Sequence, residues 1–244
     1  MVRLSDKSSG SGQAKVKPGQ GRQRLMDAAL ELAASTRSLA SLGLREVARH
    51  AGLNPNTFYR HFKNFDELGL AMIQELGVDL RQGLRARRLQ AAADGFRLSD
   101  SGDPAQRIEQ AQDVIRQSIS LVLDSTTDHQ SAYIVGIREL FGTSPVLRKA
   151  VRQLLEDIAI DMRDDLLGVL ELPGVTDEQM HEIAFAVIRQ MVFFSMDYLE
   201  QPERRDQIRR QAERFILMLF WGALAAKAPE LVLASGARFP SFDE

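Results

Sequence analysis

The sequence of 244 residues contains no cysteine, only three tyrosines and a single tryptophan. The absence of cysteine excludes disulfide frameworks, zinc–thiolate centres and cysteine nucleophiles. The longest apolar run, from Phe215 to Ala226, is shorter than the roughly 20 residues with which a helix crosses a bilayer. The N-terminus also lacks the continuous apolar segment of a signal peptide. We therefore expect a cytoplasmic protein that does not enter a membrane.

Spacings typical of metal sites and catalytic sites are also missing. An acidic run from Glu156 to Asp165 repeats at helical spacing opposite Leu155 and Ile158, which predicts a solvated helix face rather than a carboxylate metal site. We expect no metal, no cofactor and no catalytic residue, so the protein is not expected to be an enzyme. The histidines show neither a metal-type spacing nor a metal-type carboxylate partner: His50, His61, His129 and His181.

Charge is divided unevenly along the chain, although the net charge is only −2. Residues 1–64 carry 11 Lys and Arg against 4 Asp and Glu, a net charge of +7. The remaining residues carry 20 against 29, a net charge of −9. Because a basic segment attracts polyanions, this division predicts two parts with different partners.

Apolar residues recur at helical spacing over most of the chain, and no segment shows a comparable alternation of strand type. Asn54 and Ser144 each precede a proline, and Thr176 stands three residues before Gln179, as N-terminal caps do. The pattern predicts an all-α fold with a mobile loop at 91–103. The expected helices lie near residues 22–35, 44–51, 55–61, 65–89, 104–125, 130–141, 145–170, 177–200 and 204–226.

Residues 44–64 predict two short helices arranged around one glycine. Gly52 can adopt the left-handed conformation that ends a helix, and Asn54 can cap the helix that follows. Phe58 and Phe62 are four residues apart and share one inward face. This is the pattern of a helix-turn-helix, whose second helix enters the major groove of DNA.

The polar face of the second short helix suits a nucleic acid. An ordinary solvated helix would show similar residues, but the basic charge of residues 1–64 favours DNA. Contacts with phosphates are expected from one set of side chains and base readout from another. The phosphate set is Arg45, Tyr59, His61 and Lys63, and the base-reading set is Thr57 and Arg60, with Asn56 as a further candidate.

These residues resemble the DNA-binding signature of TetR-family transcriptional regulators. The resemblance rests on LREVA at 44–48, AGL at 51–53, FYRHF at 58–62 and EL at 67–68. It implies a leading helix, the helix-turn-helix, a long connecting helix and an all-α ligand-binding and dimerisation domain, over about residues 22–226. Many family members open the fourth helix with a lysine, where this chain has Phe65, so Lys63 is expected to take over that phosphate contact.

The composition and the resemblance together predict four parts. Residues 1–21, rich in Ser, Gly, Lys and Gln, bury too little to fold and are expected to form a flexible basic arm. The other predicted parts are a helix-turn-helix domain at 22–67, a ligand-binding and dimerisation domain at 68–228 and a C-terminal tail at 229–244.

A finer resemblance concerns one branch of this family. Residues 41–77, together with the motif that runs from Arg138-Glu139 to Gly142-Thr143-Ser144, are similar to the FabR-like and DesT-like repressors of unsaturated fatty-acid synthesis. This resemblance implies a homodimeric repressor that binds a double-stranded DNA operator. It also implies a hydrophobic effector, long-chain acyl-CoA or an acyl-carrier thioester.

The apolar residues of the second half can be either a filled core or a chain-shaped pocket, and their spacing does not separate the two. Arg138 is the first candidate for the head group of a ligand, although an acidic neighbour can equally pair with it. The side chains expected at such a pocket are Ile119, Leu123, Tyr133, Ile137, Arg138, Phe141, Met162, Met191 and Phe194.

The last two predicted helices carry wide apolar faces. Because a single chain rarely exposes so much apolar surface, we expect a two-fold four-helix interface between two copies. Two alternatives stay open: a TetR-type regulator of an efflux or catabolic operon with another hydrophobic ligand, and an all-α lipid-binding protein or enzyme without DNA binding. The residues expected at the interface are Tyr198, Ile208, Phe215, Leu219 and Trp221.

Overall fold

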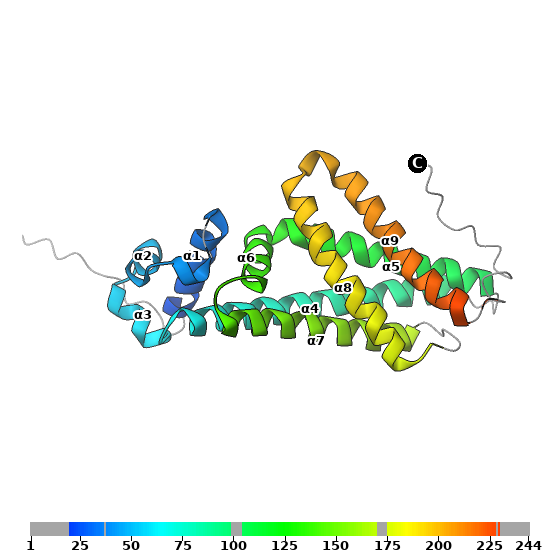
Figure 1. Cartoon of the computed structure of the whole chain (residues 1–244), viewed down its shortest axis with the longest axis horizontal. Coiled ribbons are helices and arrows are strands. Elements are labelled where there is room, and N and C mark those ends of the chain that lie inside the picture. Colours follow the sequence, from blue (N-terminus) through cyan, green and yellow to red (C-terminus); the bar gives the residue numbers. More distant parts are fainter. Residues whose placement is uncertain (1–19, 37, 99–103, 170–174, 228, 230–244) are drawn as a thin grey trace, which may run out of the picture.

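The computed structural model describes residues 20–36, 38–98, 104–169, 175–227 and 229, and every regular element in these ranges is helical (Figure 1). This confirms the all-α prediction. None of the described helices combines the length and the apolarity of a membrane span. The elements are α1 (Gln20–Thr36), η1 (Leu39–Ser41), α2 (Leu44–His50), α3 (Pro55–His61), α4 (Phe65–Leu98), α5 (Pro104–Asp128), α6 (Gln130–Leu140), α7 (Pro145–Val169), α8 (Asp177–Glu200), η2 (Pro202–Arg204) and α9 (Arg205–Lys227).

The largest difference from the predicted helices is the length of α4. Residues 91–98, expected as the start of a mobile loop, continue this helix to Leu98. Small residues therefore did not end the helix, because alanine is itself a strong helix former. The rest of the expected loop, 99–103, lies outside the described residues, as do 1–19 of the expected arm and 230–244 of the expected tail.

Local capping explains where several helices begin. The Asn54 side chain accepts a hydrogen bond from the Asn56 amide at 2.9 Å. Thr176 and Gln179 exchange two hydrogen bonds of 3.2 Å at the start of α8, which confirms the predicted capping box. The Ser144 hydroxyl accepts from the Leu147 amide at 3.2 Å and donates to Asp66 at 2.6 Å. Ser144 therefore caps α7 and joins it to the first turn of α4.

Helices α4 and α7 lie side by side along the long axis of the molecule, with α1, α2 and α3 at one end (Figure 1). The two helices approach closely where α4 carries glycine. A Cβ atom at Gly69 would lie 2.8 Å from a methyl group of Leu147, and one at Gly77 would lie 2.8 Å from a methyl group of Leu154. These contacts advance together along both sequences, so α4 and α7 run parallel.

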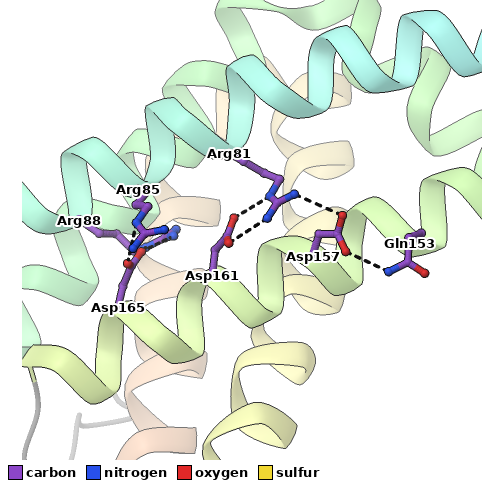
Figure 2. A network of polar contacts seen from close by, with 7 residues as sticks. All are labelled: Arg81, Arg85, Arg88, Gln153, Asp157, Asp161 and Asp165. Atoms are coloured by element: carbon purple, nitrogen blue, oxygen red, sulfur yellow. Dashed lines mark hydrogen bonds and ion pairs between the residues drawn. The ribbon is translucent and has the colours of Figure 1, made fainter.

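A ladder of arginines and aspartates joins the same two helices (Figure 2). Arg81 binds both oxygens of Asp161, at 2.6 and 2.9 Å, and its third contact is an oxygen of Asp157 at 3.3 Å. The hydrogen bonds from Arg81 hold the pKa of the Asp161 carboxyl below its ordinary value. In the next rung, Arg85 and Arg88 lie 3.3 and 2.7 Å from the buried Asp165.

The ladder corrects the predicted solvated face of α7. The carboxylates of Asp161 and Asp165 face arginines of α4, and Asp165 is only 6% exposed. Within the same acidic run, Glu156 pairs with His181 at 2.9 Å. Asp164 is the exposed member, as the prediction required of the whole run. No group of acidic or histidine residues in the described ranges is arranged to hold a metal ion.

The described residues form two large hydrophobic cores and a small third cluster of Leu84, Leu121 and Ile158. One is built by α5, α7, α8 and α9 and includes Trp221 and Tyr198. The other lies under α1, α2 and α3 and the first turns of α4, and it also contains Val135 of α6 and Leu147 of α7. The core beneath α1, α2 and α3 is therefore not confined to residues before 68.

Candidate DNA-binding and effector sites

The turn between α2 and α3 is built as the sequence predicts. Gly52 has a φ of 64°, the left-handed conformation that glycine adopts without steric cost. Beyond it, the Leu53 amide donates to the Ala48 carbonyl at 2.8 Å and closes the end of α2. The Phe58 ring is fully buried beneath α3 and lies 5.5 Å from the ring of Phe65. Phe65 is therefore half-buried and packs against the core beneath α1, α2 and α3.

The seven residues expected to bind DNA lie on α2, α3 and the segment after α3. Tyr59 is 64% exposed, and Thr57 and His61 are half-buried. The His61 ring lies against α1, because a Cβ atom at Gly21 would be 2.8 Å from its Nε2 atom. The four other side chains are exposed: Arg45, Asn56, Arg60 and Lys63.

Three of these exposed side chains are cationic and are positioned to bind an external anion. Across the described ranges, the side chains of Arg45, Arg60 and Lys63 form neither an ion pair nor a hydrogen bond. One more cation, not singled out from the sequence, lies at the turn: the Arg24 guanidinium would be 2.7 Å from a Cβ atom at Gly52. A residue on α1, 28 positions earlier, could be placed there only through the fold.

An apolar cavity of about 110 Å³ lies among α4, α5, α6, α7 and α8. Its lining includes Tyr133 and Ile137 of α6 and Met191 of α8, three of the residues predicted at a pocket. A second cavity of about 50 Å³ includes the predicted Ile119 and Met162 in its lining. The two cavities share the side chains of Leu84, Val122, Ile188 and Met191.

The remaining predicted pocket residues lie elsewhere. Leu123 and Phe194 are buried in the core and line neither cavity. Phe141 is 71% exposed. The Arg138 guanidinium donates to the carbonyls of Ala33 and Ala34, at 2.7 and 3.1 Å. Arg138 thus provides hydrogen bonds to the last carbonyl groups of α1 and does not line the cavity. The residues next to Arg138 in the sequence did not indicate this role.

Arg138 and Glu139 join α6 to the end of the molecule formed by α1, α2 and α3, and we call this pair of residues the latch. The fully buried Glu139 accepts a hydrogen bond from the Leu39 amide at 2.8 Å. The latch therefore binds the chain on both sides of the α1–η1 junction. Arg138 binds the last turn of α1, and Glu139 binds the first residue of η1. Because α6 also supplies Tyr133 and Ile137 to the larger cavity, this one short helix touches both sites.

The residues expected between two copies are mostly inside the single chain. Ile208, Trp221 and Tyr198 are between 2% and 6% exposed and belong to the core of α5, α7, α8 and α9. Their apolar faces are covered by the other helices of the chain, so these three residues offer no exposed interface. Phe215 and Leu219 are half-buried and pack against the same core.

Comparison with known proteins agrees with this geometry. Residues 25–72 match the family model described as bacterial regulatory proteins, tetR family. The fold of most of the chain is similar to that of a tetR-family transcriptional regulator from Streptomyces coelicolor, with a TM-score of 0.61, 17% identity and coverage of 89% of this chain and 87% of that one.

Two further similar structures hold ligands. The transcriptional regulator FadR from Bacillus subtilis, in complex with stearoyl-CoA, has a TM-score of 0.54 and 17% identity, over 81% of this chain and 96% of that one. The SmeT–triclosan complex has a TM-score of 0.56 and 17% identity, over 84% of this chain and 90% of that one. At 17% identity, these similarities show that the fold is shared and show nothing more specific.

Proposed function

We propose that this chain is a transcriptional regulator of the TetR type, a homodimeric repressor that binds operator DNA and responds to a long-chain fatty acyl thioester. The genes it controls would be those of fatty-acid metabolism, with unsaturated fatty-acid synthesis as the first candidate. The observation that carries the proposal is the apolar cavity against α6, the helix whose next two side chains hold the α1–η1 junction. The stearoyl-CoA complex of the similar FadR structure supports the class of effector.

In the proposed complex, α3 lies in the major groove of a pseudo-palindromic operator. Arg45, Tyr59, His61 and Lys63 would contact phosphates. Base edges would be read by Thr57 and Arg60, with Asn56 beside them. In a two-fold dimer the two copies of α3 would lie roughly 34–36 Å apart, one turn of the DNA helix.

The proposed response to the effector depends on the small volume of the cavity. A cavity of about 110 Å³ is smaller than the ~150 Å³ that accommodates benzene, so a long acyl chain enters only if the lining moves. Burial of the chain would contribute about 0.8 kcal/mol per methylene, which favours such a movement. A preference of about 1.4 kcal/mol for one state would change operator affinity tenfold.

The experiment begins with selection of operator fragments from random DNA by the full-length protein. Retention that falls steeply with salt supports DNA binding and contradicts the alternative of a lipid-binding protein or enzyme without DNA binding. The selected operator is then titrated in the presence of palmitoyl-CoA, oleoyl-CoA or free CoA. The proposal requires that both acyl thioesters change operator affinity and that free CoA does not.

A second candidate is a regulator of an efflux or catabolic operon that binds another hydrophobic molecule. It is favoured by the similarity of the fold to the SmeT–triclosan complex and by the almost wholly apolar lining of the cavity, which does not by itself require a thioester. Triclosan in the same titration separates the candidates. Release of the operator by triclosan, with no effect of either acyl thioester, would replace the first proposal by the second.

A further inference from the structure

A broad groove lies on the surface where the α6–α7 junction meets α8. Its volume is about 620 Å³, within the range of roughly 300–1,000 Å³ that small-molecule sites occupy. Four cationic side chains line it: Arg148, Lys149, Arg152 and Arg189.

Two of these cations already have partners in the fold. The Arg148 guanidinium donates to the Gly142 carbonyl, and that of Arg189 lies over the Phe185 ring, 5.6 Å from its centroid. The exposed Lys149 and Arg152, in contrast, have no ion-pair or hydrogen-bond partner for their side chains among the residues that the structure describes. The groove therefore carries positive charge that no other described residue compensates by an ion pair.

One acidic side chain, that of Glu156, lines the groove, and it pairs with a histidine outside the lining. Glu156 lies 2.9 Å from Nε2 of His181. At the rim, Phe141 and Phe193 are 71% and 53% exposed. Exposed aromatic rings next to cations suit a ligand that combines phosphates with a planar ring, because the cations bind the phosphates and the rings stack on the base.

The groove and the larger apolar cavity are neighbours. Leu140, Leu155 and Val192 line both of them. A chain-shaped ligand that extends from the groove into the cavity would pass these shared side chains. A cationic outer site and an apolar inner site are thus adjacent along one path.

We infer that the groove binds the phosphate-bearing head group of the effector whose apolar chain occupies the cavity. This inference rests on the proposed function and makes it more specific: the effector is an acylated nucleotide thioester and not a free fatty acid. It also replaces Arg138, whose guanidinium serves the end of α1, by Lys149 and Arg152 as the cations of the head group.

The test compares the wild type with a Lys149→Ala/Arg152→Ala double variant by calorimetric titration. The ligands are palmitoyl-CoA, palmitoyl-pantetheine, which has the thioester but no phosphates, and palmitate. The double variant should bind palmitoyl-CoA about tenfold or more weakly, because each lost contact is charge-assisted, and should bind palmitoyl-pantetheine as the wild type does. A matched control is Arg210→Ala/Lys227→Ala, which removes two exposed cations of α9 outside the groove.

Each other outcome has a distinct meaning. Equal affinity of wild type and double variant for palmitoyl-CoA overturns the head-group site but leaves the proposed function intact. If none of the three acyl ligands binds the wild type, the proposed function fails together with the inference. A change in sedimentation of the double variant, with unchanged palmitoyl-CoA affinity, would show that a second copy of the chain covers the groove and would also overturn the inference.

Discussion

At the scale of single residues, Gly52 shows how strongly the helix-turn-helix depends on backbone conformation. Its φ of 64° is strained for any other residue, and an added Cβ would lie 2.7 Å from the Arg24 guanidinium. We predict that Gly52→Ala lowers the free energy of unfolding by about 1 kcal/mol or more and weakens operator binding. Denaturant unfolding and operator titration measure the two effects.

The control for this variant is Gly83→Ala on α4, where an added Cβ would have no described atom within 4 Å apart from its chain neighbours and the backbone of its own helix. Alanine favours a helix by about 0.8–1 kcal/mol over glycine, so this variant should be as stable as the wild type or more so. Equal stability of the two variants would contradict the role given to Gly52.

Lys63 allows a sharper test of the DNA-binding surface. Its side chain is exposed and unpaired among the described residues, as expected of a phosphate ligand. Lys63→Ala should weaken binding about equally on all DNA sequences and reduce the slope of log affinity against log salt by about one. Lys227→Ala, at the end of α9, removes an equally exposed charge and should change neither quantity.

At the scale of helices, the latch on α6 connects a helix of the cavity with the end of the molecule formed by α1, α2 and α3. Arg138→Ala removes two hydrogen bonds to the end of α1 but no side chain of the larger cavity. We predict that this variant binds palmitoyl-CoA with wild-type affinity, while the change in operator affinity that the effector causes is reduced. Calorimetry and operator titration report the two properties separately, and loss of effector binding itself would return Arg138 to the ligand site.

The ladder between α4 and α7 gives a prediction for stability and pH. Asp161→Asn should lower the free energy of unfolding by about 1–3 kcal/mol at pH 7, because it removes charge-assisted hydrogen bonds from Arg81. The pKa of Asp161 is lowered in the folded state, so its contribution is complete above the ordinary pKa of Asp, about 3.9, and is lost as the pH falls through the lower folded value.

Denaturation midpoints of wild type and Asp161→Asn should therefore differ at neutral pH and converge in acid. Asp164→Asn is the matched control, since Asp164 is exposed and contacts only the adjacent Arg163 among the described residues. An equal loss of stability in both variants would indicate that the ladder adds nothing beyond surface charge.

At the scale of the whole molecule, the sequence predicted the features that depend on neighbouring residues. It did not predict contacts between residues that lie far apart in the sequence. Asn54 and Thr176 cap helices as expected, because a cap depends on three or four neighbouring residues. Asp161 looked solvated because its partner Arg81 is 80 residues away. Trp221 looked like an interface residue because an apolar face does not show whether its cover comes from the same chain.

A prediction for assembly follows from Gly222, which is exposed on α9 and where an added Cβ would meet no described atom within 4 Å beyond its chain neighbours and the backbone of its own helix. We therefore expect Gly222→Arg to leave the fold of the single chain unchanged. If two copies associate through α8 and α9, as the sequence predicts, the same change places a charged side chain between them, and sedimentation at micromolar concentration should detect monomers. Gly83→Arg on α4 is the control, and a wild type that sediments as a monomer would contradict the dimer.

The core shared between the two ends of the molecule also bears on how the chain is made. Val135 and Leu147 complete the core beneath α1, α2 and α3, yet both are synthesised well after the helix-turn-helix has left the ribosome. At ~5–20 residues per second, the intervening ~80 residues take roughly 4–16 s to translate. During that interval the nascent DNA-binding end lacks two of its core side chains, so it should mature only when the helices that surround the cavity have emerged.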